Sequence, residues 1–462
     1  MRYQDFVSRK LTRAAPTGLP AVPDLHPSLF PFQRDLVGWA LKRGRCAIFA
    51  ATGLGKTRMQ IEWARHVHAH TGNPVLILAP LAVAAQTAAE GAKMDVPISV
   101  CRDAKDVTPG LDIANYECLH RLDPTIFGGI VLDESSIIKH HDAATLGQLM
   151  AAFSQTPFKL CATATPAPND FTELGTHAEF LGICRRTEML SEHFCHDGGE
   201  TATWRLKGHA REAFWRFVAS WGALLRAPSD LGYPDEGFAL PPLNTHQHII
   251  AADKASTRKA GLLFATEAQT LSERRNARRA SIDARVQRCA DLVNGDAEPW
   301  IVWCDLNAES DALKSTIRGA IEVRGSDDLD VKEQRLRDFA EGRARVLVTK
   351  PSIAGFGLNW QHCARVAFVG ITDSFEAYFQ AVRRCWRFGQ KRPVEVHIFA
   401  SELEGSVVKN LARKEADSAM MADELSAETR GALQSEVFGQ VRQTRAYAPE
   451  LGMEIPTWLR SE

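Results

Sequence analysis

Long hydrophobic runs and paired cysteines are both missing from this chain of 462 residues. No window approaches the roughly 18 uninterrupted apolar residues that a membrane-spanning helix requires, and no secretory apolar stretch follows the basic N-terminal residues. The ten cysteines are scattered singly, without a Cys-x-x-Cys pair, and several lie inside apolar runs, as Cys46 and Cys161 do. Isolated cysteines of this kind are typical of reduced, buried thiols, so the sequence predicts a cytoplasmic protein.

An excess of either charge is also missing. Lysine and arginine number 55 against 56 for aspartate and glutamate, which leaves a formal net charge of -1. The field of the whole molecule therefore gives no general attraction to a polyanion, and nucleic-acid binding would have to come from local basic patches. Hydrophobic residues at 45% and charged residues at 24% exclude the disordered and collagen-like classes.

The length predicts two or three domains. Two of them can be located, because strand-like and helix-like segments alternate in two separate parts of the sequence. Short β-branched or aliphatic runs alternate with helical patterns, which indicates α/β domains with parallel sheets. The expected strands are residues 46–50, 75–79, 112–115, 130–133 and 159–163 in the first block, and 300–304, 320–323, 345–349, 365–369 and 394–399 in the second. Between residues 170 and 295 the sequence is mostly helical, aromatic and charged.

A loop with two glycines follows the first expected strand, and a helical pattern begins after it at Arg58. This strand, loop and helix form the context of a P-loop, in which backbone amides and the positive end of the helix dipole hold phosphates. Lys56 would reach the β- and γ-phosphates and the Thr57 hydroxyl would ligate magnesium. The residues expected to bind the nucleotide here are Thr52, Gly53, Leu54, Gly55, Lys56 and Thr57. Ala50 replaces the first glycine of the general consensus, and an ordinary Gly-rich turn is the alternative explanation.

Two adjacent acids end the buried-strand pattern of residues 130–133. Asp133 and Glu134 would lie at the carboxyl end of a parallel strand, where ligands bind in open α/β sheets. Asp133 would hold magnesium through water, and Glu134 would orient and deprotonate an attacking water. A solvated turn is the alternative, and the nearby P-loop pattern argues against it.

Together these residues resemble the motifs of superfamily 2 helicases. Lys56 and Thr57 resemble motif I, the acid pair motif II, and Thr163 to Pro166 motif III. Residues 29–33, with Phe32 and Gln33, are similar to the adenine-recognising Q motif. Residues 355–359 resemble motif V, and the resemblance makes Gly357 a further nucleotide-binding residue. Residues 380–390 resemble motif VI in the form typical of the Swi/Snf-type branch. The compact length is most similar to members of this branch found in phages and prophages, which implies a bacterial or phage-infected cell.

The resemblance implies two tandem RecA-like domains that use ATP and Mg²⁺. It divides the chain into an N-terminal extension at 1–28, a first lobe at 29–235 with a helical subdomain at about 185–230, a linker and basic helical segment at 236–295, a second lobe at 296–425, and a C-terminal tail at 426–462. Arg384 and Arg387 would act as catalytic arginines, three residues apart on one face of a helix expected from about 374 to 388. They would reach the γ-phosphate when the lobes close, because they come from the second lobe.

Nucleic acid should lie across both lobes and be contacted mainly at phosphates and sugars, which makes binding largely independent of sequence. The resemblance gives Pro80, Gln86, Asn115, Thr349, Lys350 and Asn359 as contacts, and Thr163, Thr165 and Gln380 as residues that couple ATP to movement. It implies a DNA-dependent ATPase, a helicase or translocase acting on double-stranded DNA. The alternative is an ATP-gated nucleic-acid clamp or assembly factor that does not translocate. A protein partner is possible and is not identified by the sequence.

Two further clusters have open interpretations. The helix expected at about 271–293 carries six arginines, and its first half either projects toward the DNA backbone or forms a solvated basic face. His193, Cys195 and His196 lack the second ligand pair that zinc sites usually show. The nearby aromatics, such as Trp204 and Trp215, are expected to form the core of a small subdomain, with stacking on bases as the alternative.

Overall fold

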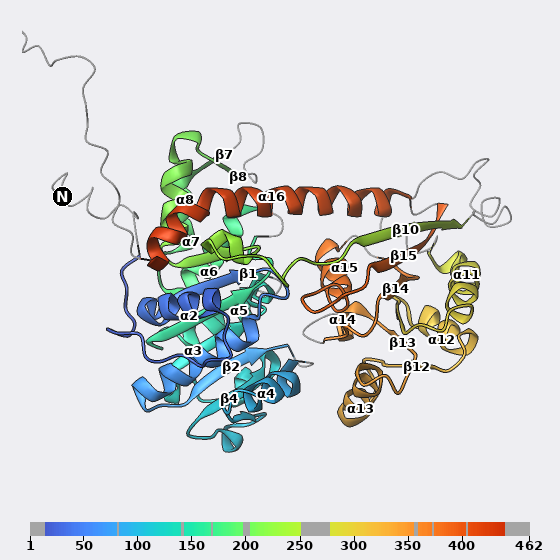
Figure 1. The fold of residues 1–462 in the computed structure, drawn as a ribbon, viewed down its shortest axis with the longest axis horizontal. Coiled ribbons are helices and arrows are strands. Elements are labelled where there is room, and N and C mark those ends of the chain that lie inside the picture. The colour runs from blue at the N-terminus through green and yellow to red at the C-terminus, as the bar shows by residue number, and fades with distance from the viewer. Residues whose placement is uncertain are drawn as a thin grey trace, which may run out of the picture.

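The computed structural model describes residues 14–80, 83–139, 143–167, 170–196, 204–250, 278–354, 359–371, 374–402 and 405–438. It has two lobes, each built on a parallel sheet covered by helices, which lie side by side in Figure 1. A long C-terminal helix runs across both of them. The two sheets confirm the α/β class with parallel strands.

The first lobe has a seven-stranded sheet in the order β3-β4-β2-β5-β6-β1-β9, with all its pairings parallel. Its strands are β1 (Arg45–Ala50), β2 (Val75–Ala79), β3 (Ile98–Val100), β4 (Leu111–Asn115), β5 (Gly129–Asp133), β6 (Phe158–Thr163) and β9 (Gly222–Leu225). The central strands are buried on both faces, as their continuous apolar sequences require.

Helices cover both faces of this sheet. They are α2 (Pro31–Arg43), α3 (Lys56–Thr71), α4 (Ala84–Ala92), α5 (Ala143–Ala152), α6 (Leu174–Leu181), α7 (Arg186–His193) and α8 (Arg211–Ala219). One core cluster includes Trp39 and Trp63, and the other includes Trp215 and Trp221. The two clusters hold the sheet between two helical layers, which fixes the ends of the strands.

The second lobe has a six-stranded sheet in the order β10-β15-β14-β11-β13-β12, again with parallel pairings. Its elements are β10 (Leu243–Ile250), α11 (Ile282–Asn294), β11 (Trp300–Trp303), α12 (Asn307–Thr316), β12 (Ala320–Glu322), α13 (Leu329–Ala340), β13 (Val346–Thr349), α14 (Pro351–Ala354), β14 (Arg365–Phe368), α15 (Phe375–Val382) and β15 (Val394–Ser401).

The last described helix, α16 (Gly405–Phe438), follows β15 of the second lobe and packs on α8, β9 and α2 of the first (Figure 1). Asp230 anchors it, because this buried carboxylate accepts hydrogen bonds from Ser426 Oγ at 2.8 Å and Arg430 Nη2 at 2.8 Å. Arg43 pairs with Glu436 near the end of the helix. The helix therefore connects the two lobes.

The lobe boundaries differ from those that the sequence predicts. β10 lies inside the range expected as a linker, yet it pairs along its length with β15, so the second sheet begins at Leu243. β9 lies in the segment expected to be mostly helical, yet it is an edge strand of the first sheet. The expected tail from residue 426 begins inside α16, where Ser426 is buried against the first lobe.

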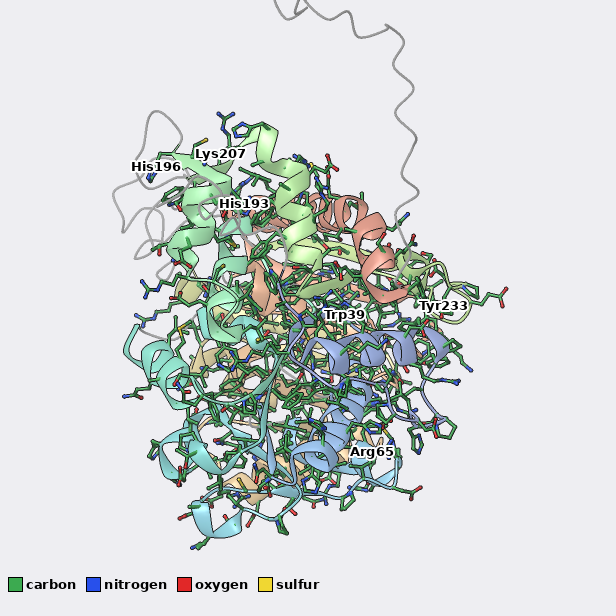
Figure 2. The ribbon with its side chains drawn as sticks, turned by 90° about the vertical axis from the view of Figure 1, so that its left-hand side faces the viewer. Trp39, Arg65, His193, His196, Lys207 and Tyr233 are labelled. Carbon is green, nitrogen blue, oxygen red and sulfur yellow. The ribbon has the colours of Figure 1, made fainter. Side chains whose placement is uncertain are left out.

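A small subdomain at one end of the first lobe contains α7, α8 and the hairpin of β7 (Phe194–His196) and β8 (Trp204–Leu206). Figure 2 shows His193 and His196 within it. His193 is buried and stacks on Phe217, and His196 packs on Trp204 with ring centroids 3.8 Å apart. Within the described ranges, no group of three His, Cys, Asp or Glu side chains is placed to hold a metal. The aromatics form a core, as expected.

The arginines of the basic helical segment do not form one projecting face. Arg285 is fully buried and pairs with Glu309 at 2.8 Å, and Arg278 is buried and pairs with Asp305 at 2.6 Å. These arginines join α11 to the neighbouring elements of the second lobe, which contradicts a nucleic-acid role for them. Arg279 and Arg288 are exposed, whereas Arg274 and Arg275 lie outside the described residues.

All ten cysteines are described, and none forms a disulfide. No helix in the described part of the chain is both long and apolar enough to cross a bilayer.

A row of imidazoles crosses the pair formed by β10 and β15. His397 stacks between His246 and His248, with ring centroids at 4.7 and 5.3 Å. Burial and then the two neighbouring imidazoles lower the pKa of His397 to about 4. Because the folded pKa lies below the ordinary value of 6.5, the unfolded chain binds the proton more tightly. Stability of the second lobe should therefore fall as the pH drops from about 6.5 to about 4.

Replacing His397 with glutamine should remove this acid-dependent loss. We expect about 1 kcal/mol less destabilisation between pH 7 and pH 5 than in the wild type, a modest value because the ring is half-exposed. Urea unfolding at the two pH values measures the difference. The same change at His209, which is exposed, should leave the pH dependence as it is. If the His397 variant loses as much stability between pH 7 and pH 5 as the wild type does, His397 is not the group responsible for the acid-dependent loss.

Candidate functional site

Three neighbouring strands of the first lobe end at one edge of the sheet with polar segments. β1 lies beside β6, and β6 lies beside β5. The loop of residues 50–57, called the phosphate loop below, follows β1, the acid pair Asp133 and Glu134 ends β5, and Thr163 ends β6. Since parallel strands present their carboxyl ends at the same edge, these segments meet there. The fold thus brings together the P-loop and acid-pair residues that the sequence predicted.

The phosphate loop depends on its glycines. Gly53 and Gly55 have φ values of 98° and 78°, which side chains other than glycine rarely adopt. A Cβ atom on Gly53 would lie 2.6 Å from the backbone nitrogen of Phe388 in the second lobe. Gly55 then caps α3, whose first residue is Lys56. The loop therefore presents its backbone at the start of a helix, in direct contact with the other lobe.

Gln33 fixes the phosphate loop from behind. Its Nε2 donates to the Leu54 carbonyl at 2.8 Å, and its Oε1 accepts from the Phe30 amide at 2.9 Å. The side chain is buried, and so is Phe32. The exposed ring of this segment is Phe30. Gln33 thus has a structural contact with the phosphate loop where the sequence predicted a contact with adenine, and Phe32 belongs to the core.

The acid pair is held by residues from two other elements. Gln60 of α3 donates through Nε2 to Asp133 Oδ1 at 2.7 Å, and the Tyr116 hydroxyl donates to the Asp133 carbonyl at 2.8 Å. Glu134 follows with φ of 49°, a left-handed conformation that costs about 1–2 kcal/mol in a residue with a Cβ. Its Oε2 is buried and has no hydrogen-bond partner among the described residues. A buried, strained carboxylate without a partner is suited to receive a ligand or a proton.

Charges from both lobes converge on Lys56. Burial lowers the pKa of Lys56, Glu134 and Asp133 raise it, and Arg387 and Arg384 lower it. Burial and the adjacent Glu134 raise the pKa of Asp133 above its ordinary range. Lys56 Nζ donates to the Ala50 carbonyl at 2.8 Å. The ammonium group, the two carboxylates and the two guanidinium groups therefore share one site, which could hold an anion with a cation beside it.

The two arginines reach this site from a turn. α15 ends at Val382, and Arg384 and Arg387 lie in the turns and bends that follow it. The single helix expected to 388 is therefore wrong at its end. Arg384 is buried, and its guanidinium donates to the carbonyl and side-chain oxygens of Gln380 at 2.9 and 3.1 Å. Gln380 thus positions Arg384, whose pKa burial and then Arg387 lower and Glu134 raises.

A row of hydroxyl groups leads from the acid pair to the end of β6. Thr163 Oγ1 donates to Ser136 Oγ at 3.3 Å and accepts from the Thr165 amide at 3.2 Å. Ser135 Oγ lies 3.0 Å from His177 Nε2, and both groups are fully buried. The expected coupling residue Thr163 is thus hydrogen-bonded to the segment that carries Glu134, and Thr165 is joined to that segment through Thr163.

The residues proposed for nucleic-acid contact divide into two groups. Asn115 caps a 3-10 helix by accepting from the Cys118 amide at 2.9 Å, and Thr349 is buried and donates to the Val323 carbonyl at 2.9 Å. These two side chains serve the fold. Lys350 lines a cavity of 140 Å³ at the carboxyl ends of β11, β13 and β14. Pro80 and Gln86 are half-buried, and Asn359 is exposed. Gly357, which was expected to bind the nucleotide, lies outside the described residues.

Several site residues carried no signal in the sequence. Phe238 stacks on Phe388 with centroids 4.7 Å apart and meets Phe30 at 5.1 Å, which joins the linker, the second lobe and the start of α2. Gln60 and Tyr116 hold Asp133. Each is an ordinary helix or loop residue in sequence, and only the fold brings them to the site.

Comparisons with known proteins give one family match and a fold. Residues 285–389 match the model of the helicase conserved C-terminal domain. A solved structure, the ATP-dependent Type ISP restriction-modification enzyme LlaBIII bound to DNA, is similar with a TM-score of 0.54 at 12% identity. The similarity covers 85% of this chain and 30% of that enzyme's chain. No curated protein matches. The chain therefore has two RecA-like α/β lobes, and the segment that matches the helicase conserved C-terminal domain lies within the second.

Proposed function

We propose that this protein is a DNA-dependent ATPase of the superfamily 2 helicase type that translocates on double-stranded DNA. The proposal includes the Swi/Snf-type branch and the compact phage or prophage form, on the resemblance of residues 380–390. The observation that carries it is the convergence of Lys56, Asp133 and Glu134 from the first lobe with Arg384 and Arg387 from the second.

The described residues fit ATP and Mg²⁺. The phosphate loop presents glycine backbone at a helix start, and the unpartnered Oε2 of Glu134 lies beside it. Thr57 and Asp133 would hold the metal, whose usual protein ligands are one or two oxygen groups together with phosphates and water. ATP supplies the transferable γ-phosphoryl group. Phe30 has the exposed ring that could pack on the base.

Each lobe would contribute different groups to ATP hydrolysis. Lys56, at the start of α3, would neutralise phosphate charge, and Glu134 would accept a proton from water. Arg384, positioned by Gln380, and Arg387 would stabilise charge that develops in the transition state. Because the arginines and Lys56 belong to different lobes, hydrolysis would depend on lobe closure.

Duplex DNA is the proposed partner. The similar restriction-modification enzyme is described as ATP-dependent and bound to DNA, which supports a nucleic-acid role for this fold. Lys350 and Asn359 of the second lobe, and Pro80 and Gln86 of the first, remain the proposed contacts, as do Asn115 and Thr349 through their backbone. With a net charge of -1, binding should be modest and should weaken as salt rises.

Displacement of a third strand from a DNA triplex tests this function. The full-length chain is mixed with a triplex whose third strand carries a fluorophore, with and without ATP. ATP-dependent release together with DNA-stimulated hydrolysis supports translocation. Binding without release supports a clamp and overturns translocation, and a forked duplex in parallel shows whether strands are separated. If DNA leaves ATP hydrolysis unchanged, the proposal fails.

A further inference from the structure

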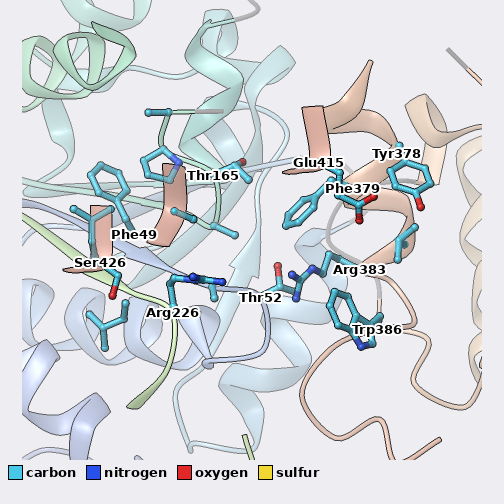
Figure 3. Close-up of a pocket in the computed structure, with 18 of the residues that line it drawn as sticks. Phe49, Thr52, Thr165, Arg226, Tyr378, Phe379, Arg383, Trp386, Glu415 and Ser426 are labelled. Atoms are coloured by element: carbon cyan, nitrogen blue, oxygen red, sulfur yellow. The ribbon is translucent and has the colours of Figure 1, made fainter. Parts of the chain in front are cut away.

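A second cavity lies between the lobes, beside the phosphate loop. It measures 260 Å³ and its walls are mainly apolar and aromatic, with Phe49 and Leu225 from the first lobe and Phe379 and Trp386 from the second. We call it the inter-lobe cavity. Its lining includes Thr52 of the phosphate loop and Thr165 after β6, and α16 closes it through Glu415 and Ser426 (Figure 3).

Two guanidinium groups enter the inter-lobe cavity from opposite lobes. Figure 3 shows Arg226 and Arg383 extending toward the space beside Thr52. Arg226 follows β9 of the first lobe and is paired with Asp423 of α16. Arg383 follows α15 of the second lobe. A cavity that is apolar except for a few convergent polar groups has the composition of a small-molecule site.

Arg383 is held in place by two aromatic rings and forms no ion pair among the described residues, where Glu415 is the carboxylate that acts on it from a distance. Its guanidinium lies over the ring of Phe379 at 4.7 Å and over that of Trp386 at 4.3 Å. Stacking of this kind fixes the plane of the group and leaves its N–H donors directed outward along that plane. Its buried Nε has no hydrogen-bond partner among the described residues, and no ion pair to Arg383 occurs there.

The local field favours a negative charge at this position. Burial lowers the pKa of Arg383, Arg226 lowers it further, and Glu415 raises it by less than Arg226 lowers it. Arg226 therefore acts on Arg383 more strongly than Glu415 does, although Asp423 pairs with Arg226. An acceptor placed between Arg226 and Arg383 would satisfy the buried Nε donor of Arg383 and reduce the repulsion between the two guanidinium groups.

We propose that the inter-lobe cavity binds a planar aromatic molecule that carries one carboxylate, with its ring against Phe379 and Trp386 and its carboxylate between Arg383 and Arg226. The aromatic walls account for the ring, and the stacked guanidinium accounts for the acid group. Because the walls come from both lobes and from α16, an occupant would also oppose separation of the lobes. The inter-lobe cavity shares Thr52 with the phosphate loop and Thr165 with the segment after β6, but its lining does not include Lys56 or Glu134.

Calorimetric titration of the full-length chain with 2-naphthoate tests the site. We expect saturable binding of one molecule per chain, with 2-naphthamide at least tenfold weaker because it lacks the charge. Arg383→Gln should weaken 2-naphthoate binding about tenfold or more. Arg226→Gln, a change on the first lobe's side of the cavity, should also weaken it. Arg216→Gln, on the exposed face of α8, is the matched control and should bind as the wild type does.

The titration contains no ATP, so its result is independent of the proposed function. Absence of saturable binding, equal affinity for the amide, or unchanged affinity in both cavity variants would each overturn the proposal. Circular dichroism establishes that the variants are folded. If one of the two cavity variants does not fold, the other decides, because the two arginines lie in different lobes.

Discussion

Glu134→Gln should lower the DNA-stimulated rate of ATP hydrolysis by about a hundredfold to ten-thousandfold, the usual contribution of a general base. The amide keeps the size of the side chain but cannot accept the proton of the attacking water. Nucleotide binding should survive, because Lys56 and the phosphate loop are untouched. Measuring steady-state hydrolysis together with binding of a fluorescent ATP analogue separates the two effects.

Two comparisons make this result specific. Lys56→Ala should lose hydrolysis and also weaken nucleotide binding, since it removes the ammonium group at the start of α3. Glu117→Gln makes the same chemical change on an exposed carboxylate and should leave the rate unaltered. Full activity in the Glu134 variant would show that another group removes the proton, and the unpartnered carboxylate would need a different explanation.

The strands that were predicted correctly are the buried ones. β2 has the predicted bounds, and β1, β5 and β6 begin one residue earlier than predicted, because central parallel strands read as continuous apolar runs. β10 was missed for the opposite reason. Its sequence has five consecutive polar residues, residues 244–248, and as an edge strand it is mostly exposed, so no apolar run marks it. Burial therefore helped to identify the central strands in advance, but it was not sufficient, because the buried edge strand β9 was missed.

The same distinction applies to the site. The phosphate loop and the acid pair are contiguous in sequence, so their types and spacing were sufficient to identify them. The side chains of Asn115 and Thr349 bond to the backbone of Cys118 and Val323, which the sequence could not show, because a polar residue at the end of a strand can either face a ligand or bond to neighbouring backbone. Phe238, Gln60 and Tyr116 reach the site only through tertiary packing, which spacing cannot reveal.

Replacing Arg384 or Arg387 should give the second large loss of ATP hydrolysis. Arg387→Ala and Arg384→Ala should each lower kcat by about a thousandfold or more, the contribution expected of an arginine that stabilises phosphoryl-transfer charge. KM for ATP should change much less, because the first lobe supplies the phosphate loop. Arg343→Ala, on the exposed surface after α13, is the control and should retain full activity.

Lysine substitutions then separate charge from geometry. Arg384 donates two hydrogen bonds to Gln380 from a planar group, which a lysine ammonium cannot reproduce in the same directions. Arg384→Lys should therefore remain strongly impaired, and Gln380→Ala should share part of the defect by releasing Arg384. If Arg384→Lys restored the wild-type rate, charge alone would suffice and the positioning by Gln380 would be irrelevant. Steady-state kinetics at saturating DNA distinguishes these outcomes, because closure of the lobes is then no longer limited by binding.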